Sequence, residues 1–427
     1  MGFSKVSVIG LGYIGLPTAA IIASRKIPVI GIDINPAAVD TINDGRVHFT
    51  EPDLDIVVHA VVMEGYLKAS LVPESADVFI IAVPTPFQED HQPDLSYIHS
   101  ACNSIAPVLK KGDLIILEST SPVGTTELIA QWLSQNRPDL SFPHDSTHTV
   151  DVNIAYCPER VLPGHVLREL VQNSRIIGGI TPACSEQAVK LYKTFVEGPC
   201  LVTDSRTAEM CKLTENSFRD VNIAFANELS IICDQLNINV WELIQLSNHH
   251  PRVNILQPGP GVGGHCIAVD PWFIVSKTPE HAHLIRAARE VNDSKPAWVV
   301  EKVQQAIYEF LQKNTGKTIK DITIACLGLS FKADIDDLRE SPSLKIVHQV
   351  TEIHRGNVLI VEPHIEMLPD SLKMKATLLP LEDALKEANI LLLLVDHKMF
   401  RETLWPDLKD IIVVDVRGII DRKGLNS

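Results

Sequence analysis

Residues 6–17 read VSVIGLGYIGLP. A short apolar run leads into Gly10, Gly12 and Gly15, and a helical pattern begins at the third glycine. Glycines in this GxGxxG spacing allow a tight turn and a close approach of a pyrophosphate to the free N–H groups of a helix N-terminus. A second apolar run ends at Asp33, 18 residues after Gly15, where a carboxylate can bind a ribose hydroxyl. The stretch predicts a dinucleotide site, and Asp33 favours NAD because a carboxylate repels the 2′-phosphate of NADP.

Short apolar runs alternate with helical patterns through about the first 200 residues. Runs of Val and Ile bounded by Gly, Pro or Asp are typical of strands buried on both faces, and hence of a parallel sheet covered by helices. The predicted strands are Val6 to Ile9, Val29 to Ile32, Val78 to Val83, Leu114 to Leu117, Val152 to Tyr156 and Arg175 to Gly178.

The middle of the chain has a helical pattern. Ser205 to about Asn237 lacks proline and glycine, and a second helical stretch runs from about Glu280 to Leu311. After a boundary at Lys313 to Lys317, KNTGK, apolar runs return at Ile322 to Leu327, Val358 to Val361, Ile390 to Val395 and Ile411 to Val414.

These patterns predict an α/β protein of three domains. Residues 1–202 form an N-terminal NAD-binding Rossmann domain, and residues 203–314 form a central helical domain with a long connecting helix. Residues 315–427 form a smaller, Rossmann-like C-terminal domain.

Composition restricts the class of protein. With 45% hydrophobic and 21% charged residues among 427, the chain has ample material for folded cores. Its net charge of −15 argues against nucleic acid and anionic membranes as partners. No apolar stretch is long enough to span a bilayer and no secretion signal is evident, so we expect a cytoplasmic protein.

The eight cysteines include no CxxC pair and no His/Cys spacing typical of metal ligands, so neither a metal site nor a disulfide framework is predicted. One of them, Cys266, lies in GPGVGGHCIAVD, Gly259 to Asp270. A thiol in a glycine-rich turn can face a substrate. A buried structural cysteine is the alternative that this segment alone leaves open.

Two further turns follow predicted strands: VPTP at Val83 to Pro86 and STSPVGTT at Ser119 to Thr126. Because ligands bind at the carboxyl ends of strands in such sheets, Thr85, Thr120 and Thr126 can line the ribose and nicotinamide side of a cofactor. Alternatively, these residues cap the helices that follow, and both roles can hold together.

Six motifs occur in the order found in one family: GLGYIGLP, VPTP, STSPVGT, AEMCKLTENSFRDVNIAFANE, GPGVGGHCIAVDP and GLSFKADIDDLRESP. On these motifs the chain resembles the nucleotide-sugar 6-dehydrogenases of the UDP-glucose/GDP-mannose dehydrogenase family over nearly its whole length. YCPERVLPG and PGPGVGGHCIAVDPWF are most similar to the branch that acts on UDP-N-acetylhexosamines, with UDP-N-acetyl-D-mannosamine as the expected substrate.

This resemblance implies an NAD-dependent, four-electron oxidation of C6 from alcohol to carboxylate, for surface polysaccharide synthesis of the enterobacterial-common-antigen kind. It also implies a C-terminal domain that binds the UDP-sugar. Cys266 matches the nucleophile that forms a thiohemiacetal and then a thioester. Lys212 is the matching cation, and Asn216, one helical turn from it, is a second donor to the oxyanion.

Three more catalytic positions match the family. Thr120 and Asp270 match residues that hold a catalytic water, and Glu159 matches the proposed general base for thioester hydrolysis. UDP-glucose dehydrogenases carry a second glutamate four residues later, where this chain has Pro163. Another group must then take over its role, or the role is absent.

The resemblance implies binding residues as well. A diphosphate needs cations, and each charge-assisted bond contributes roughly 1.5 to 3 kcal/mol. The matching substrate residues are Arg160, Val161, Lys212, Asn216, Arg219, His250, Arg252, Gly263, Phe331, Lys332 and Arg417. The matching NAD residues are Gly10, Gly12, Tyr13, Ile14, Gly15, Asp33, Thr85, Thr120, Thr126 and, from the C-terminal domain, Arg339.

The sequence leaves three alternative functions open. The first is the same reaction on UDP-N-acetylglucosamine or UDP-glucose. A hydroxyacid dehydrogenase is another, although that class lacks the cysteine turn and the third domain. A non-catalytic sensor of NAD or nucleotide sugar is a third. The resemblance suggests a homodimer through the long central helix, whose apolar face can equally be covered within one chain.

Overall fold

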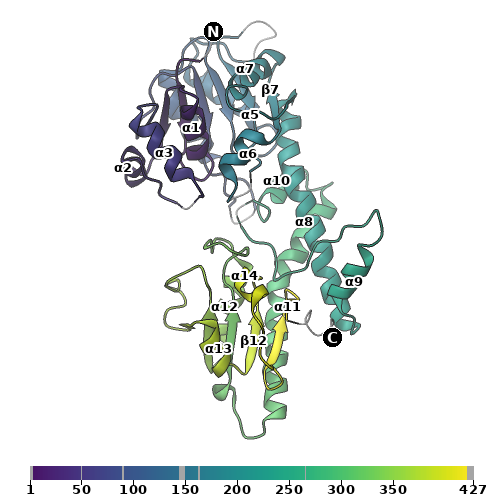
Figure 1. Cartoon of the computed structure of the whole chain (residues 1–427). Helices are drawn as coiled ribbons and strands as arrows, with labels where there is room; N and C mark the ends of the chain where they lie inside the picture. The colour runs from purple at the N-terminus through teal and green to yellow at the C-terminus, as the bar shows by residue number, and fades with distance from the viewer. Residues whose placement is uncertain are drawn as a thin grey trace. The chain divides into compact units, whose positions relative to one another are not determined.

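The structure is a computed structural model of the whole chain, and it describes residues 3–49, 51–88, 91–143, 150–161, 164–264 and 266–420. Contacts divide the chain into two compact units (Figure 1). The first comprises Met1–Glu215 and Trp272–Thr278, and the second comprises Asn216–Pro271 and Pro279–Ser427. The division into three domains stays a prediction.

The first unit is built on an eight-stranded sheet in the order β3-β2-β1-β4-β5-β6-β7-β8. The strands are β1 (Val6–Ile9), β2 (Val29–Ile32), β3 (Leu67–Ser70), β4 (Val78–Ile81), β5 (Leu114–Leu117), β6 (Asn153–Tyr156), β7 (Arg175–Gly179) and β8 (Cys200–Asp204). The first six strands are parallel and have the order of a dinucleotide-binding Rossmann fold, as predicted.

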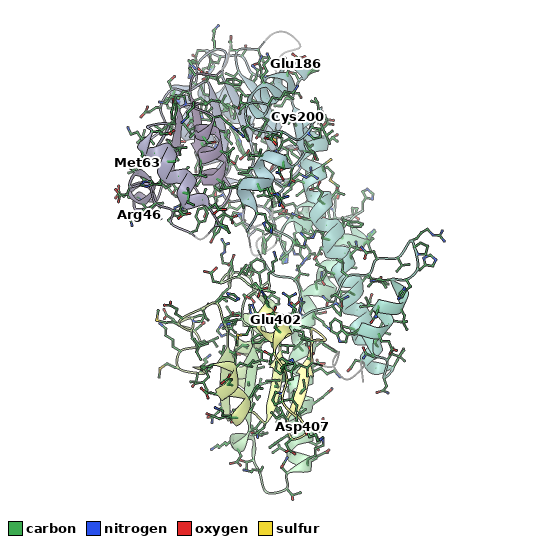
Figure 2. All side chains as sticks on the ribbon, in the orientation of Figure 1. Arg46, Met63, Glu186, Cys200, Glu402 and Asp407 are labelled. Carbon is green, nitrogen blue, oxygen red and sulfur yellow. The ribbon has the colours of Figure 1, made fainter. Side chains whose placement is uncertain are left out.

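Nine helical segments belong wholly or mostly to this unit among the described residues. They are α1 (Gly15–Ser24), α2 (Pro36–Asn43), α3 (Leu54–Met63), α4 (Ser96–Ile105), η1 (Ala106–Val108), α5 (Thr125–Asn136), α6 (Val166–Gln172), α7 (Pro182–Tyr192) and the greater part of α10 (Asp270–Lys277). Polar and exposed side chains such as Arg46 and Met63 project outward (Figure 2).

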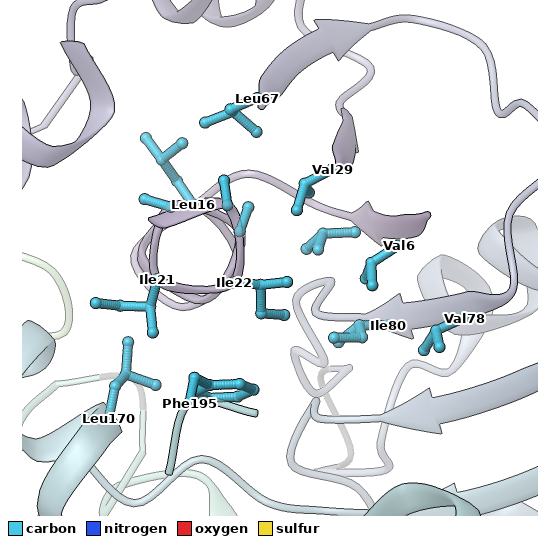
Figure 3. Close-up of a cluster of buried hydrophobic side chains, with 14 of the residues drawn as sticks. Val6, Leu16, Ile21, Ile22, Val29, Leu67, Val78, Ile80, Leu170 and Phe195 are labelled. Carbon is cyan, nitrogen blue, oxygen red and sulfur yellow. The ribbon is translucent and has the colours of Figure 1, made fainter. Parts of the chain in front are cut away.

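A hydrophobic core holds α1 against the sheet, directly after the glycine turn. Ile22 of α1 is buried with Val29 and Ile80 of the sheet, and Ile21 packs toward Leu170 and Phe195 on the other side of the helix (Figure 3). Apolar strands buried on both faces therefore hold the helix whose N-terminus follows the glycines.

The second unit combines long helices with a smaller sheet. The helices are most of α8 (Ser205–Gln235), α9 (Val240–Ser247), α11 (His283–Lys313), η2 (Ile319–Asp321), α12 (Pro342–Ile353), α13 (Leu381–Glu387) and α14 (Lys398–Glu402). The parallel sheet has the order β11-β10-β9-β12-β13, with β9 (Thr323–Leu327), β10 (Asn357–Val361), β11 (Thr377–Leu378), β12 (Ile390–Leu393) and β13 (Ile412–Asp415).

One hydrophobic core joins α11 to this sheet. Val299, Val303 and Phe310 of α11 are buried in one cluster with Ile324 and Ile360 of the strands. The long helix and the C-terminal strands consequently form one compact unit.

Polar contacts tie α8 to α11. The Arg289 guanidinium donates to Asp220 at 2.7 Å, and both side chains are buried. One turn further along α11, Asn292 accepts from Asn227 at 2.9 Å. Lys295 donates to the Ser230 hydroxyl at 2.6 Å, and burial lowers the pKa of Lys295 to about 7.

The sequence prediction needs three corrections. β7 is antiparallel to β6, with Tyr156 opposite Gly178, so the sheet is not parallel throughout. The strands β3, β8 and β11 were not predicted, because these edge strands are short or partly exposed and lack a continuous apolar run. Most other predicted ends differ by one or two residues. Among the described residues, no helix combines the length and apolar character that crossing a bilayer requires.

Candidate functional site

The glycine turn has the geometry that its spacing predicts. Gly10 has a φ of +92°, and a Cβ there would lie 2.6 Å from the Ala82 carbonyl oxygen. A Cβ on Gly15 would lie 1.8 Å from the Gly10 oxygen, whereas one on Gly12 would meet nothing within 4 Å. Two glycines are therefore required by packing, and Gly12 leaves open space for a ligand.

Asp33 is anchored beside this turn. Its Oδ2 accepts from the Leu11 amide at 2.9 Å and its Oδ1 from the Asn35 amide at 2.9 Å. The turn follows β1, which is the strand next to β4 at the point where strand order reverses, the usual place for a nucleotide in such a sheet. These residues fit NAD.

The threonine turns differ among themselves. The Thr85 hydroxyl is shielded from solvent and has no hydrogen-bond partner among the described residues, which suits a ligand contact. Thr120 is half-buried, and its neighbour Ser119 donates to the Val83 oxygen at 2.7 Å, joining the two turns. Thr126 instead donates both its amide and its hydroxyl to the buried Glu209, at 2.8 and 2.6 Å. The Gly124 amide also donates to Glu209, at 2.6 Å, so Glu209 and not Thr126 caps the start of α5.

The remaining predicted NAD residues are spread over both units. Ile14 directly precedes α1, and the Tyr13 ring packs on Phe49 with centroids 4.3 Å apart. Arg339 belongs to the second unit, where its guanidinium pairs with Asp337 at 2.6 Å.

Lys212 and Glu159 are brought together within the first unit. The Lys212 ammonium donates to the Glu159 backbone oxygen at 2.8 Å. The Glu159 carboxylate accepts from the Arg160 amide at 2.7 Å and from the Arg175 guanidinium at 2.6 Å. The predicted base is thus buried and ion-paired, and its partner Arg175 was not predicted.

Glu118 is a second carboxyl group that the sequence analysis missed. It is buried at the end of β5, accepts from the Tyr192 hydroxyl at 2.8 Å and contacts Thr18 at 3.4 Å. Burial, with the nearby Glu159 carboxylate, raises the pKa of Glu118 to about 7. A glutamate just before a Ser-Thr turn is a sequence signal that could have pointed to it.

Asn216 and Asp270 meet within the second unit. Asn216 Nδ2 donates to Asp270 Oδ2 at 2.5 Å, and both residues are buried. Asp270 also begins α10, and its amide donates to the Cys266 oxygen at 2.8 Å. Cys266 is half-exposed, in no disulfide, and one turn from that carboxylate.

The glycines before Cys266 are packed against the loop that carries Phe331. A Cβ on Gly263 would lie 2.6 Å from the Glu340 oxygen and 2.8 Å from Phe331, and Gly264 has a φ of +80° with Phe331 3.0 Å from its ideal Cβ. The structure thus unites two predicted substrate residues, Gly263 and Phe331, beside the cysteine turn.

The other predicted substrate residues occupy several places. Arg160 makes a two-bond ion pair with Glu215, at 3.0 and 2.7 Å. Arg417 pairs with Asp396 at 2.5 Å, and its guanidinium lies 2.5 Å from the ideal Cβ of Gly259.

Five of these residues have less specific surroundings, and the position of Pro163 is not described. Val161 is half-buried against the first core, and Arg219 and Lys332 are exposed. His250 and Arg252 share an exposed turn after α9, where the Arg252 amide donates to His250 Nδ1 at 3.3 Å. Pro163 lies outside the described residues.

Three stretches of the chain match consecutive domains of one family. Residues 4–196 match the NAD binding domain of the UDP-glucose/GDP-mannose dehydrogenase family, residues 206–294 its central domain, and residues 325–422 its UDP binding domain.

Individual relatives match over nearly the full length. The chain is 62% identical to the NDP-N-acetyl-D-galactosaminuronic acid dehydrogenase of Ralstonia nicotianae, over 99% of this chain and 98% of that protein. It is also 62% identical to the UDP-N-acetyl-D-mannosamine dehydrogenase of Yersinia pestis, over 98% of this chain and 100% of that protein.

Solved structures agree in fold. The UDP-D-ManNAc dehydrogenase of Pyrococcus horikoshii matches with a TM-score of 0.85 at 39% identity, over 97% of this chain and 96% of that one. A UDP-N-acetyl-mannosamine dehydrogenase of Staphylococcus aureus matches with a TM-score of 0.83 at 43% identity, over 97% and 95%. The chain is therefore an NAD-dependent dehydrogenase that belongs to the UDP-glucose/GDP-mannose dehydrogenase family.

Proposed function

We propose that the protein oxidises UDP-N-acetyl-D-mannosamine at C6, from alcohol to carboxylate, with two equivalents of NAD. The observation that carries the proposal is the cysteine turn, which packs against Phe331 in the domain that matches the family's UDP binding domain. The names of the Yersinia pestis and Escherichia coli relatives, at 62% and 60% identity, support this sugar.

Cys266 makes the second oxidation possible. NAD, when bound, accepts the hydride that leaves C6 in each oxidation. An aldehyde releases a second hydride readily only after a nucleophile adds to its carbonyl. The Cys266 sulfur therefore bonds to C6 while the thiol proton passes to the carbonyl oxygen. Loss of the C6 hydride and of the hydroxyl proton from this thiohemiacetal leaves a thioester.

Lys212 and Asn216 stabilise the oxygen that develops negative charge. They lie four residues apart on α8, so their side chains point to one face of the helix. Asn216 is fixed by its bond to Asp270, and Lys212 by its bond to the Glu159 oxygen. Donors held in place in this way favour the charged oxygen without reorganisation.

Hydrolysis of the thioester returns the thiol and releases the carboxylate. Glu159 is the base in our proposal, and its carboxylate is ion-paired with the Arg175 guanidinium. Thr120 and Asp270 position the water. Glu118 is a second buried carboxyl group, and it lies close enough to Glu159 for the two to interact electrostatically.

Four cationic side chains bind the diphosphate of the UDP-sugar in our proposal. They are Arg160, Arg219, Lys332 and Arg417. His250 and Arg252 complete the substrate site, and Arg339 reaches NAD. Guanidinium and ammonium groups are the usual partners of a diphosphate.

We also propose a cytoplasmic homodimer. Phe218 and Phe225 of α8 are 69% and 51% exposed, and Ile232 and Leu236 continue the same apolar stripe at 44% and 62%. A stripe with this spacing on a long helix suits a second copy of the chain. All eight cysteines are thiols, which fits a reducing compartment.

Product counting tests the function. The pure protein is incubated with NAD and each of several UDP-sugars, and NADH is counted per sugar consumed. Two NADH per UDP-N-acetyl-D-mannosamine supports the proposal. One NADH per sugar would contradict the thioester route, and no turnover on any sugar would favour a sensor.

A second sugar is favoured by one observation. The Ralstonia nicotianae relative, whose name specifies an N-acetyl-D-galactosaminuronic acid, is as similar as the Yersinia pestis relative. The panel therefore includes UDP-N-acetyl-D-galactosamine, and the higher kcat/KM of the two sugars identifies the substrate.

A further inference from the structure

The C-terminal sheet has its own reversal of strand order. β9 lies between β10 and β12, so the loops that follow β9 and β12 border the place where a nucleotide binds in such sheets. The loop after β9 contains Leu329 to Asp334 and therefore Phe331 and Lys332. The loop after β12 leads to His397, which is 0% exposed.

The buried carboxylate of Glu362 accepts hydrogen bonds from both loops. Glu362, at the end of β10, accepts from the Leu329 amide at 2.7 Å, the Ser330 amide at 3.2 Å and His397 Nε2 at 3.1 Å. Burial alone would raise the pKa of Glu362, but the bonds from His397 and from backbone amides outweigh burial and lower it. The group at the centre is thus a carboxylate.

His397 holds the far end of the loop. Its Nδ1 accepts from the Asp334 amide at 3.0 Å, so the ring proton is on Nε2, which donates to Glu362. Asp334 in turn accepts from the Lys398 amide at 2.7 Å. One imidazole therefore fixes both ends of the segment that presents Phe331 and Lys332.

A metal site is the competing interpretation. Ligand atoms of Asp334, His364 and His397 lie within 4.8 Å of one another. Both ring nitrogens of His397 are already used, one as acceptor and one as donor, so a metal would have to displace the Asp334 amide. The geometry favours a role in fixing the loop.

We propose that His397 is a positioning residue for the nucleotide half of the substrate, which fixes the Leu329 to Asp334 loop across the strand-order reversal through its two ring nitrogens. The inference rests on the proposed function, because it takes Phe331 and Lys332 as substrate contacts. His397 itself touches no reacting atom in this account.

UDP binding to the full-length protein tests the proposal. Calorimetric titration with UDP compares the wild type with His397→Leu, His397→Asn and His397→Gln. Asn retains an acceptor near the Asp334 amide, and Gln retains a donor toward Glu362. We expect His397→Leu to weaken UDP binding about tenfold, or about 1.4 kcal/mol, with smaller losses in the other two. The KM for the UDP-sugar should rise while kcat and NAD binding stay near wild type.

His354 provides a matched control in the same domain. It is also buried, but its Nε2 bonds to the Ile322 oxygen at 2.9 Å, at the opposite end of β9. His354→Leu should lower the thermal midpoint and leave UDP affinity unchanged.

The outcomes separate cleanly. Equal UDP affinity in the wild type and all His397 variants, or an equal loss in His354→Leu, overturns the positioning role. If His397→Leu does not fold, the Asn and Gln variants decide in the same way. Failure of the wild type to bind UDP contradicts the proposed function instead.

Discussion

Arg175 Nη1 lies 2.6 Å from Glu159 Oε2, and the two side chains are only 1% and 5% exposed. Each partner comes from a different strand end, Arg175 from the start of β7 and Glu159 from just beyond β6. Their pairing is possible because β7 runs antiparallel to β6, which brings its chain back beside the segment after β6. The candidate base is therefore held by the feature of the sheet that the sequence did not predict.

Removing Arg175 should destabilise the protein strongly. Arg175→Met leaves the buried Glu159 without its partner, and we expect a loss of about 3 to 5 kcal/mol in the free energy of unfolding, measured by urea denaturation. The double variant Arg175→Met, Glu159→Gln should recover part of that loss. Additive losses in the double variant would show that the two side chains do not act as a pair.

Glu118 should make stability depend on pH. Its pKa is raised from 4.5 to about 7, so the carboxyl group favours folding below pH 4.5 and this contribution is lost as the pH rises to 7. The shift corresponds to about 3 kcal/mol. Glu118→Gln should therefore become more stable relative to wild type between pH 4.5 and 7, with a constant difference above pH 7.

Unfolding measured at pH 5 and pH 8 tests this dependence. Glu186→Gln, on the exposed surface of α7, is the control and should show the same small difference at both pH values (Figure 2). A Glu118→Gln difference that is also the same at pH 5 and pH 8 would rule out a buried, titrating carboxyl group.

Cys266 should be indispensable for turnover. In Cys266→Ala no thiohemiacetal can form, so we expect kcat for the full oxidation to fall by about 10³-fold or more, the scale of losing a catalytic nucleophile. NADH fluorescence in stopped flow measures it, and NAD binding should be unchanged.

Cys200→Ala is the control for this prediction. Cys200 lies on the edge strand β8 in the first unit and should be replaceable without loss of activity (Figure 2). Two NADH per sugar at the normal rate from Cys266→Ala would sink the covalent mechanism.

Asn216 should affect catalysis more than binding. Asn216→Ala removes a buried donor that is fixed by Asp270, and we expect kcat to fall about 10²- to 10³-fold, as for other oxyanion donors. Steady-state kinetics should show an unchanged KM for NAD. Asn222→Ala is the control, because the Asn222 side chain donates along α8 to the Phe218 oxygen. A change in KM for the sugar alone would assign Asn216 to binding.

Gly12 and Gly15 should behave differently when replaced by Ala. The Gly12→Ala methyl group enters open space, so stability should stay within about 0.5 kcal/mol while NAD binding weakens at least tenfold. The Gly15→Ala methyl group would meet the Gly10 oxygen at 1.8 Å, so this variant should unfold at lower temperature. Thermal melts and NAD titration measure both, and normal NAD affinity in Gly12→Ala would argue against the site.

Local signals in the sequence predicted much of the fold. The observed bounds of β1, β2 and β5 agree with the prediction, and the long helices α8 and α11 were also predicted. Gly10, Gly15 and Asp33 have the conformations and contacts that their spacing indicated. These features depend on residues close together in the chain, whose steric limits and apolar runs can be read without knowing the fold.

The side-chain pairs between residues far apart in the sequence became visible only in the folded structure. Tyr192 and Glu118 are 74 residues apart, His397 and Glu362 are 35 apart, and Arg175 meets Glu159 because one strand reverses direction. Apart from Glu159, these residues lie outside the motifs that the sequence analysis quoted. Burial gives them their partners and, for Glu118, its raised pKa, because a charge removed from water is stable only where packing supplies a donor or a counter-ion.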